Sequence, residues 1–346
     1  MNLMVNSLPT RTWNRLGMNE AHVDLEGTYN DYLPGAQVPG GIRWEAAAEA
    51  LPQVIPGDLD AVTDSHPASL AVTEENVKME APLVLTYHCA PGDKAAGRLV
   101  LQAGAGSRMR VVLVLSGEAH TSVLETKVLA QKDAVVELYV AQLLGGRGCF
   151  HLAGICEENA EIDLTKLELG AEKLYAGANV ELRGRQSRFC TEAAYHGRSG
   201  QSLDMNYVAV HLGRETESRM QVNGTLVDGA KKVFRGTIDF RKGCAGSVGN
   251  ETENVLLLGD QMVNQTIPLI LCKEEDVEGN HGASIGRLDD KVLFYMGSRG
   301  IDEATAQQIV TQARLDAVCD RFPVESVRKQ VREFEILRGI THGTEL

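Results

Sequence analysis

The chain has 346 residues, with 34 basic and 47 acidic side chains and a net charge of −13. This acidic balance argues against nucleic acid or an anionic membrane as the main partner. Glycine is abundant, at 35 residues, and aromatic residues make up only 5%, so many turns and small packed side chains are expected. Seven cysteines, an odd number in a chain of this size, argue against a disulfide framework.

Two features favour a cytoplasmic location. The sequence contains no apolar run of about 18 residues that could span a membrane. The stretch from Met1 to Pro9 lacks the basic and apolar regions of a secretion signal.

Residues 1–80 are expected to form an irregular segment that packs on the domain that follows. This region contains both tryptophans and six of the ten prolines, and most of it reads as extended or looping. One short helix is predicted around Glu45–Leu51.

Residues 81–298 read as a succession of short strands. Apolar side chains occupy alternate positions in Val233–Phe240, Arg219–Leu226 and Leu203–Ala209, while Arg235 and Asp239 fall on the opposite face of the first of these. No helical period separates the strands, which excludes a doubly wound α/β fold. A sandwich, a barrel and a β-solenoid remain open.

Residues 299–337 have a helical period instead. Asp302 is suited to cap the first helix, and Pro323 stands where a second helix would start. The apolar stripe of the first helix contains Ala306, Ile309, Val310, Ala313 and Ala317, and that of the second contains Val324, Val327, Val331 and Phe334. Two short helices cannot bury both stripes alone, so they dock either on the strand domain or on another protein. Residues 338–346 are expected to form a tail.

Several catalytic signatures are absent from the sequence. Neither a G-x-x-x-x-G-K-[ST] phosphate loop nor a G-x-S-x-G nucleophile elbow occurs. Cys149 and Cys156 flank His151, but their spacing differs from that of a zinc finger, and buried strand positions explain them better.

Thr266–Glu274 is predicted to be a strand with two different faces. The more apolar face contains Ile267, Leu269 and Leu271. Cys272 and Glu274 lie on the opposite face, beside Ile270, and this face is expected to be the outer one. Cys272 would then be a thiol that can be reached from outside.

His281 follows in a Gly-Asn-His-Gly bend, a few residues after an acidic run. A thiol, carboxylates and an imidazole within ten residues could bind iron. A solvated acidic turn and a histidine that bonds the backbone of the bend explain the same residues without a metal.

The same region carries a longer pattern, PLILCKEEDVEGNHGASIGRLDDKVLFYMGSRGI. In order, it contains an acidic pair before Val277, then His281-Gly282-Ala283, Gly286, an acidic turn, Leu293-Phe294-Tyr295 and Ser298-Arg299-Gly300. Upstream, Phe234–Gly236 leads to Leu256–Gly259, and Leu8–Trp13 stands near the start. Together these stretches resemble the SufB/SufD family of iron–sulfur cluster assembly proteins, and the resemblance spans most of the chain.

The resemblance implies a right-handed parallel β-helix followed by C-terminal helices, which favours the solenoid among the open folds. It also implies a scaffold subunit and not an enzyme. The acidic charge and the lack of an apolar span already argue against nucleic-acid and membrane partners. Family members pair through their β-helix ends with a second SufB or SufD chain, so a homodimer or a heterodimer is expected. Their C-terminal helices hold a SufC-type ABC ATPase. The docking candidates are then Ile309, Val310, Ala313, Val324, Val327 and Val331.

The resemblance further implies a transient iron–sulfur cluster that is shared with a partner chain, with none bound permanently. His281 occupies the place of a histidine in the SufD branch. Gly279 stands where many SufD members have a cysteine, and Met262 stands where the SufB branch places a cluster-building cysteine. These departures favour a short SufD-like subunit, with Cys272 as a substitute thiolate and Glu274 beside it.

Two other classes of protein remain open on the residues alone. A carbohydrate-active β-helix enzyme would usually carry a secretion signal and a groove of paired carboxylates with aromatic side chains, and this aromatic-poor sequence argues against it. A structural β-helix would use the terminal helices only as caps.

Overall fold

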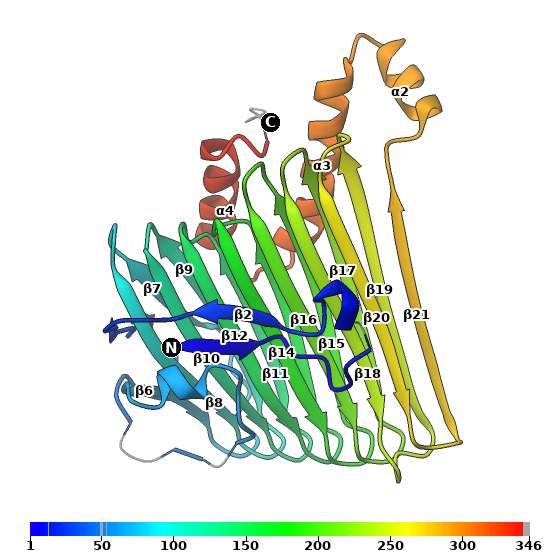
Figure 1. Ribbon diagram of the computed structural model, residues 1–346. Coiled ribbons are helices and arrows are strands. Elements are labelled where there is room, and N and C mark those ends of the chain that lie inside the picture. Colours follow the sequence, from blue (N-terminus) through cyan, green and yellow to red (C-terminus); the bar gives the residue numbers. More distant parts are fainter. Residues whose placement is uncertain (13, 49–50, 53, 342–346) are drawn as a thin grey trace.

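Figure 1 shows the computed structural model of the chain, which describes residues 1–12, 14–48, 51–52 and 54–341. Its body is a β-solenoid of eight coils, each of which adds one strand to each of two sheets. The mainly β, parallel β-helix that the sequence predicts is therefore confirmed.

The two sheets take alternate strands of the coils. The first sheet contains β6 (Ala68–Thr73), β8 (Lys94–Ala103), β10 (Thr121–Ala130), β12 (Arg147–Cys156), β14 (Lys173–Leu182), β16 (Ser202–His211), β18 (Lys231–Phe240) and β20 (Val263–Cys272). The second contains β7 (Leu83–Cys89), β9 (Arg108–Gly117), β11 (Val135–Gln142), β13 (Glu161–Glu168), β15 (Arg188–Gly197), β17 (Glu217–Val227), β19 (Ser247–Leu258) and β21 (Val277–Gly286).

Each strand pairs in parallel with the equivalent strand of the next coil, and the register holds along the whole strand. Thr121–Ala130, for example, pairs residue for residue with Arg147–Cys156. Because side chains alternate along a strand, successive coils stack residues of the same parity in the lumen.

A left-handed residue at one corner of successive coils helps to set the repeat. These residues are Asn76, Gly106, Asp133, Asn159, Gln186, Glu215 and Gly246, with φ between 55° and 77°. Their backbone N–H groups donate to carbonyls of the next coil, as from Asp133 to Glu158 (2.9 Å) and from Asn159 to Arg185 (2.8 Å). Gly, Asn and Asp tolerate this conformation best, which explains why turn residues recur along the sequence.

Alternate side chains of each strand fill the lumen. Phe234, Ile238 and Phe240 of β18 are buried in the main core, which confirms the alternation in Val233–Phe240. Arg235 lies on the outer face of the same strand, yet it is only 1% exposed because the N-terminal segment covers it.

The N-terminal segment crosses the outer face of the first sheet (Figure 1). Its elements are β1 (Asn2–Val5), η1 (Asn14–Leu16), β2 (Ala21–Asp24), β3 (Asn30–Asp31), β4 (Gly35–Gln37), β5 (Arg43–Glu45) and α1 (Asp60–Thr63). We call residues 1–29 together with residues 54–66 the N-terminal strap. Val23 and Leu59 of the strap pack with Val123 and Cys149 of the sheet.

The first coil is capped by β5, which pairs antiparallel with β6. The Ala48 N–H also donates to the Ala68 carbonyl (2.8 Å). The helix predicted around Glu45–Leu51 is therefore wrong over Glu45–Ala48, because pairing with the sheet edge satisfies this backbone. Glu49 and Ala50 lie outside the described residues, as does Trp13 of the Leu8–Trp13 stretch.

Three helices follow the coils: α2 (Asp290–Gly297), α3 (Glu303–Cys319) and α4 (Glu325–Leu337). Strand structure expected up to residue 298 is wrong at α2, where the Asp289 side chain accepts the Lys291 N–H (2.7 Å) and caps a helix. Helix α3 packs on β13, β15 and β17, on the outer face of the second sheet. Of the expected tail, residues 338–341 are described and residues 342–346 are not.

Gly224 of β17 gives a direct test of lumen packing. A Cβ at Gly224 would lie 1.9 Å from Cζ of Tyr195, whose ring crosses it. We expect Gly224→Ala to lower the free energy of unfolding by about 1–3 kcal/mol through overpacking. Urea unfolding measures this, with Gly282→Ala as the control because a Cβ there meets nothing within 4 Å. Equal unfolding midpoints for the two variants would contradict the packing described here.

Candidate functional site

The solenoid ends in an open coil formed by β20 and β21. The final strand, β21, pairs with β19 on one side, and within the described ranges no strand pairs with its other edge. All its residues after Val277 are exposed, including Ile285 at 49%. An unpaired edge of this length presents a row of free N–H and C=O groups to any strand of another chain.

The three predicted ligand residues lie at this open end. The Cys272 thiol is exposed and donates to the Glu274 carbonyl (3.0 Å). The Glu274 carboxylate accepts the Gly243 N–H (2.8 Å), and this bond lowers the pKa of Glu274. His281 is exposed within β21, in register with Glu251 of β19. The bend expected around His281 is wrong, because parallel pairing with β19 extends this stretch.

The predicted faces of Thr266–Glu274 are reversed. Cys272 is in register with Phe240 and Ile270 with Ile238, so Cys272 and Ile270 face the lumen side of the coil. Ile267 is instead buried on the outer face, under the N-terminal strap. Alternation alone could not assign the faces, because the strap covers the apolar outer face while the last coil leaves its lumen side open. Cys272 is accessible because the lumen side of the last coil is open.

A buried polar cluster lies in the lumen close to the open end. Glu253 of β19 accepts hydrogen bonds from Tyr195 (2.9 Å) and Thr266 (2.6 Å) and forms an ion pair with Lys232 (2.6 Å). The side chains of Lys232 and Glu253 are both fully buried. Such a pair is costly to desolvate and therefore needs the further hydrogen bonds that Tyr195 and Thr266 provide.

Glu251 lies beside this cluster and has a different environment. It is 2% exposed, and neither carboxylate oxygen has a hydrogen-bond partner among the described residues. Burial, together with the nearby charge of Glu253, raises the pKa of Glu251 to about 7. The absence of a side chain at Gly236 leaves room for Glu251, because a Cβ there would lie 2.8 Å from its carboxyl carbon.

Sequence reasoning missed this cluster, although a signal for it exists. Lys232 has the same parity as Phe234, and Glu251 and Glu253 have the same parity as Val255. A buried ionic cluster is indicated when charged residues stand at lumen-facing positions of successive strands, as they do here on β18 and β19.

The predicted docking residues of the C-terminal helices separate into two groups. Val327 and Val331 of α4 are buried (4% and 0% exposed) against the second sheet, and Val324 packs beside them. These three side chains are therefore not available to a partner, because the solenoid itself covers the stripe. The other three docking candidates lie on α3. Ile309 and Ala313 are exposed, and Val310 is half-buried.

The stripe predicted for α3 is also shifted around the helix. The buried residues of α3 are Ala306, Thr311, Leu315, Val318 and Cys319. Ile309, at 46% exposure, instead lines an outward groove of about 310 Å³. Helix α2 precedes α3 and contacts it, and none of the side chains of α2 is buried; Phe294 is 80% exposed.

No group of three His, Cys, Asp or Glu side chains comes together to hold a metal ion in the part of the chain that the structure describes. All seven cysteines are free, and Cys149 and Cys156 are buried strand residues, as the sequence predicts. Among the described helices, none has the length and apolar composition needed to cross a bilayer.

A comparison with protein families identifies the family of the chain. Residues 88–314, more than half of the chain, match the family model described as SUF system FeS cluster assembly, SufBD core domain. The chain belongs to the SufB/SufD family. The resemblance seen in the sequence is thereby confirmed.

Individual SufB/SufD relatives are similar over part of their length. SufD of Bacillus subtilis is 30% identical over 141 residues, which cover 41% of this chain and 32% of that protein. SufD of Escherichia coli is 34% identical over 164 residues, covering 47% and 38%. A SufBD family protein of Staphylococcus saprophyticus is 22% identical over 267 residues, covering 74% and 57%. The chain thus spans between about a third and three fifths of the relatives' lengths.

Glu251 makes the stability of this SufB/SufD chain depend on pH. Its folded-state pKa of about 7 is raised from the ordinary value of 4.5. Its contribution to stability is therefore fully present below pH 4.5, declines as the pH rises, and is lost once the pH has passed about 7. We expect Glu251→Gln to remove this part of the pH dependence.

Urea unfolding of the wild type and Glu251→Gln between these pH values measures the effect. Glu278→Gln is the matched control, since Glu278 is exposed on β21. The difference in unfolding free energy between wild type and Glu251→Gln should change with pH, and that between wild type and Glu278→Gln should not. Parallel curves for all three proteins would contradict a raised pKa at Glu251.

Proposed function

We propose that this chain is a non-catalytic scaffold subunit of a SUF-type iron–sulfur cluster assembly complex, and that it pairs through its open coil with another SufB/SufD-like chain. The observation that carries the proposal is the unpaired edge of β21. A strand of another chain can satisfy such an edge by continuing the sheet. The proposal places this assembly in the cytoplasm.

A second solenoid end is the partner that fits this surface best. The open coil presents two sheet edges and the uncovered lumen side between them, where Ile270 and Val277 are only partly buried. A single added strand would cover one edge and leave the other exposed. The end of a homologous coil would continue both sheets and cover Ile270, and either a second copy or a different SufB/SufD-like chain has this shape.

The cluster is the cargo of this scaffold, and two side chains of the open end are suited to hold it. Cys272 offers an accessible thiol and His281 an accessible imidazole, both of which are iron–sulfur ligands. Glu274 is the weaker candidate because its carboxylate bonds the backbone of the neighbouring turn. Donors from the paired chain would complete the set, and a site divided between two chains can open to release its cluster.

The outward surface of α2 and α3 is the proposed docking site for a SufC-type ABC ATPase. Phe294 of α2 and Ile309 of α3 expose apolar area there, and Ile309 also lines the groove along α3. The sequence has no phosphate loop of its own, so the ATPase would supply the nucleotide chemistry. We assign the docking site to this surface and not to the stripe of α4, because the second sheet buries Val327 and Val331.

The docking surface is tested by charge substitution. Ile309→Asp should abolish co-purification with the SufC-type ATPase of the same source, because it places a carboxylate in the apolar contact, while the melting temperature stays unchanged. Val38→Asp is the control, since Val38 has the same 46% exposure in the N-terminal segment. Normal ATPase binding by Ile309→Asp would exclude this surface.

The cargo site is tested by iron and sulfide content of the assembled complex. His281→Ala and Cys272→Ala should each lower the iron bound per complex after reconstitution, because each removes one donor. His88→Ala controls for the loss of an exposed histidine far from the open end. Unchanged iron content in both variants would remove these two residues from the site.

A further inference from the structure

A row of polar residues lies at one register across the outer face of the first sheet. In order along the solenoid, the row is Glu125, His151, Gly177, Asn206 and Arg235. The four residues with side chains are all buried, because the N-terminal strap covers them. The row runs toward β20 and the open end.

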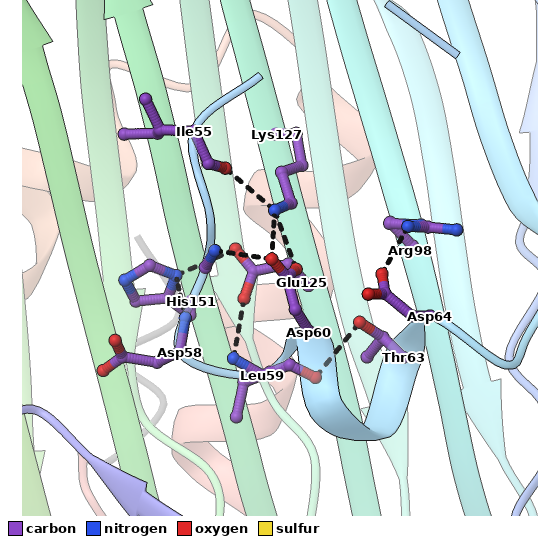
Figure 2. Close-up of polar contacts among 11 residues, drawn as sticks. Ile55, Asp58, Leu59, Asp60, Thr63, Asp64, Arg98, Glu125, Lys127 and His151 are labelled. Carbon is purple, nitrogen blue, oxygen red and sulfur yellow. Dashed lines mark hydrogen bonds and ion pairs between the residues drawn. The ribbon is translucent and has the colours of Figure 1, made fainter. Parts of the chain in front are cut away.

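The strap is fixed at the end of this row that is farthest from β20, at Glu125 and His151, as Figure 2 shows. The Glu125 carboxylate accepts the Leu59 N–H (3.1 Å) and bonds His151 Nδ1 (2.8 Å). Lys127 donates to the Asp60 carboxylate (2.7 Å) and to the Ile55 carbonyl (2.9 Å). The loop before α1 is thus held on the third and fourth coils by buried charged contacts.

Hydrogen bonds continue from this anchor along the strap. The Asp58 carboxylate accepts the Asn6 N–H (2.8 Å), and the Asn6 side chain donates to the Asp204 carboxylate (2.7 Å). The strap can cross here only because residue 177 is glycine. A Cβ at Gly177 would lie 2.8 Å both from the Asn6 amide oxygen and from the His151 ring.

Residues Leu8 and Met18 of the strap reach β20, the strand of the first sheet at the open end. Arg235 pairs with Asp204 (2.6 Å) and donates to the Met18 carbonyl (2.8 Å). Leu8 and Met18 bury Ile267, which lies on the outer face of β20, to 1% exposure. The strap lies outside the region that matches the family model, which begins at residue 88.

We propose that the N-terminal strap acts as a clasp that holds the edge strand β20 in position for pairing. One edge of β20 is free, and its lumen side is only partly buried, although Thr266 donates to Glu253 there (2.6 Å). Strand β18, this bond and the strap are therefore its main restraints. A strand that must accept a partner needs its backbone held at the pairing geometry beforehand, because ordering it on binding would reduce affinity. Leu8 and Met18 supply this restraint, and the bonds of Asn6 and Arg235 keep them in place.

This inference rests on the proposed function in one respect, namely that the open end pairs with another chain. The clasp itself is tested on the chain alone by amide hydrogen exchange. Leu8→Ala should raise the exchange rate of β20 amides at least about fivefold, because local opening becomes easier when the cover of Ile267 is lost. Val23→Ala is the matched control, since it truncates a buried side chain of the same strap that packs on Val123, far from β20.

Association with the SufB/SufD-like chain of the same source is then measured for the same proteins. Leu8→Ala should weaken association by a similar factor, and Val23→Ala should leave it unchanged. Equal β20 exchange in the two variants would overturn the clasp, and so would faster β20 exchange with unchanged association. If the wild type associates with no such chain, the proposed function fails, while the exchange comparison still decides whether the clasp exists.

A second variant covers the case in which Leu8→Ala does not fold. Asn6→Ala removes the bond to Asp204 without touching Ile267. It should raise exchange in the strap and in β20 together. Faster exchange of the strap with β20 unchanged would show that the strap does not restrain the strand.

Discussion

Parallel, in-register pairing of each coil with the next is the interaction on which the rest of this structure depends. It satisfies the backbone of every interior strand and stacks side chains of the same parity in the lumen. It also has an unavoidable consequence, since the last coil has no successor to bond. The first coil is capped by β5 within the same chain, whereas β21 keeps a free edge among the described residues. The feature that builds the solenoid therefore also creates the open edge that we propose as its pairing surface.

The two outer faces of the solenoid are covered in different ways. The N-terminal strap lies on the first sheet, and α3 with α4 lies on the second, where Val331 is fully buried. Neither covering reaches the free edge of β21, but the strap contacts the outer face of β20 through Leu8. The strap and the proposed pairing edges therefore meet at one end of the molecule, where Cys272 and His281 are exposed.

Much of the fold could be predicted from the sequence, but not the burial of each face. Alternation identified the strand Val233–Phe240 correctly, and the family pattern selected the solenoid. The faces of β20 were assigned wrongly because Leu8 and Met18 cover Ile267, and alternation contains no information about a cover so distant in the chain. For the same reason Val327 was expected to bind a partner, although the second sheet buries it. In both cases, contacts between segments remote in the sequence determine which side chains are buried. Cys272 is accessible, as predicted, but because the lumen side of the last coil is open and not because it lies on the outer face.

We propose that the open coil is completed by the end of another SufB/SufD-like solenoid. Native mass spectrometry of the chain, alone and with such a chain from the same source, measures this most directly when combined with hydrogen exchange of β21. We expect an assembly that contains two solenoid chains and strong protection of the Val277–Gly286 amides on assembly. Monomers under all conditions, or an assembly in which these amides exchange as fast as in the free chain, would contradict it.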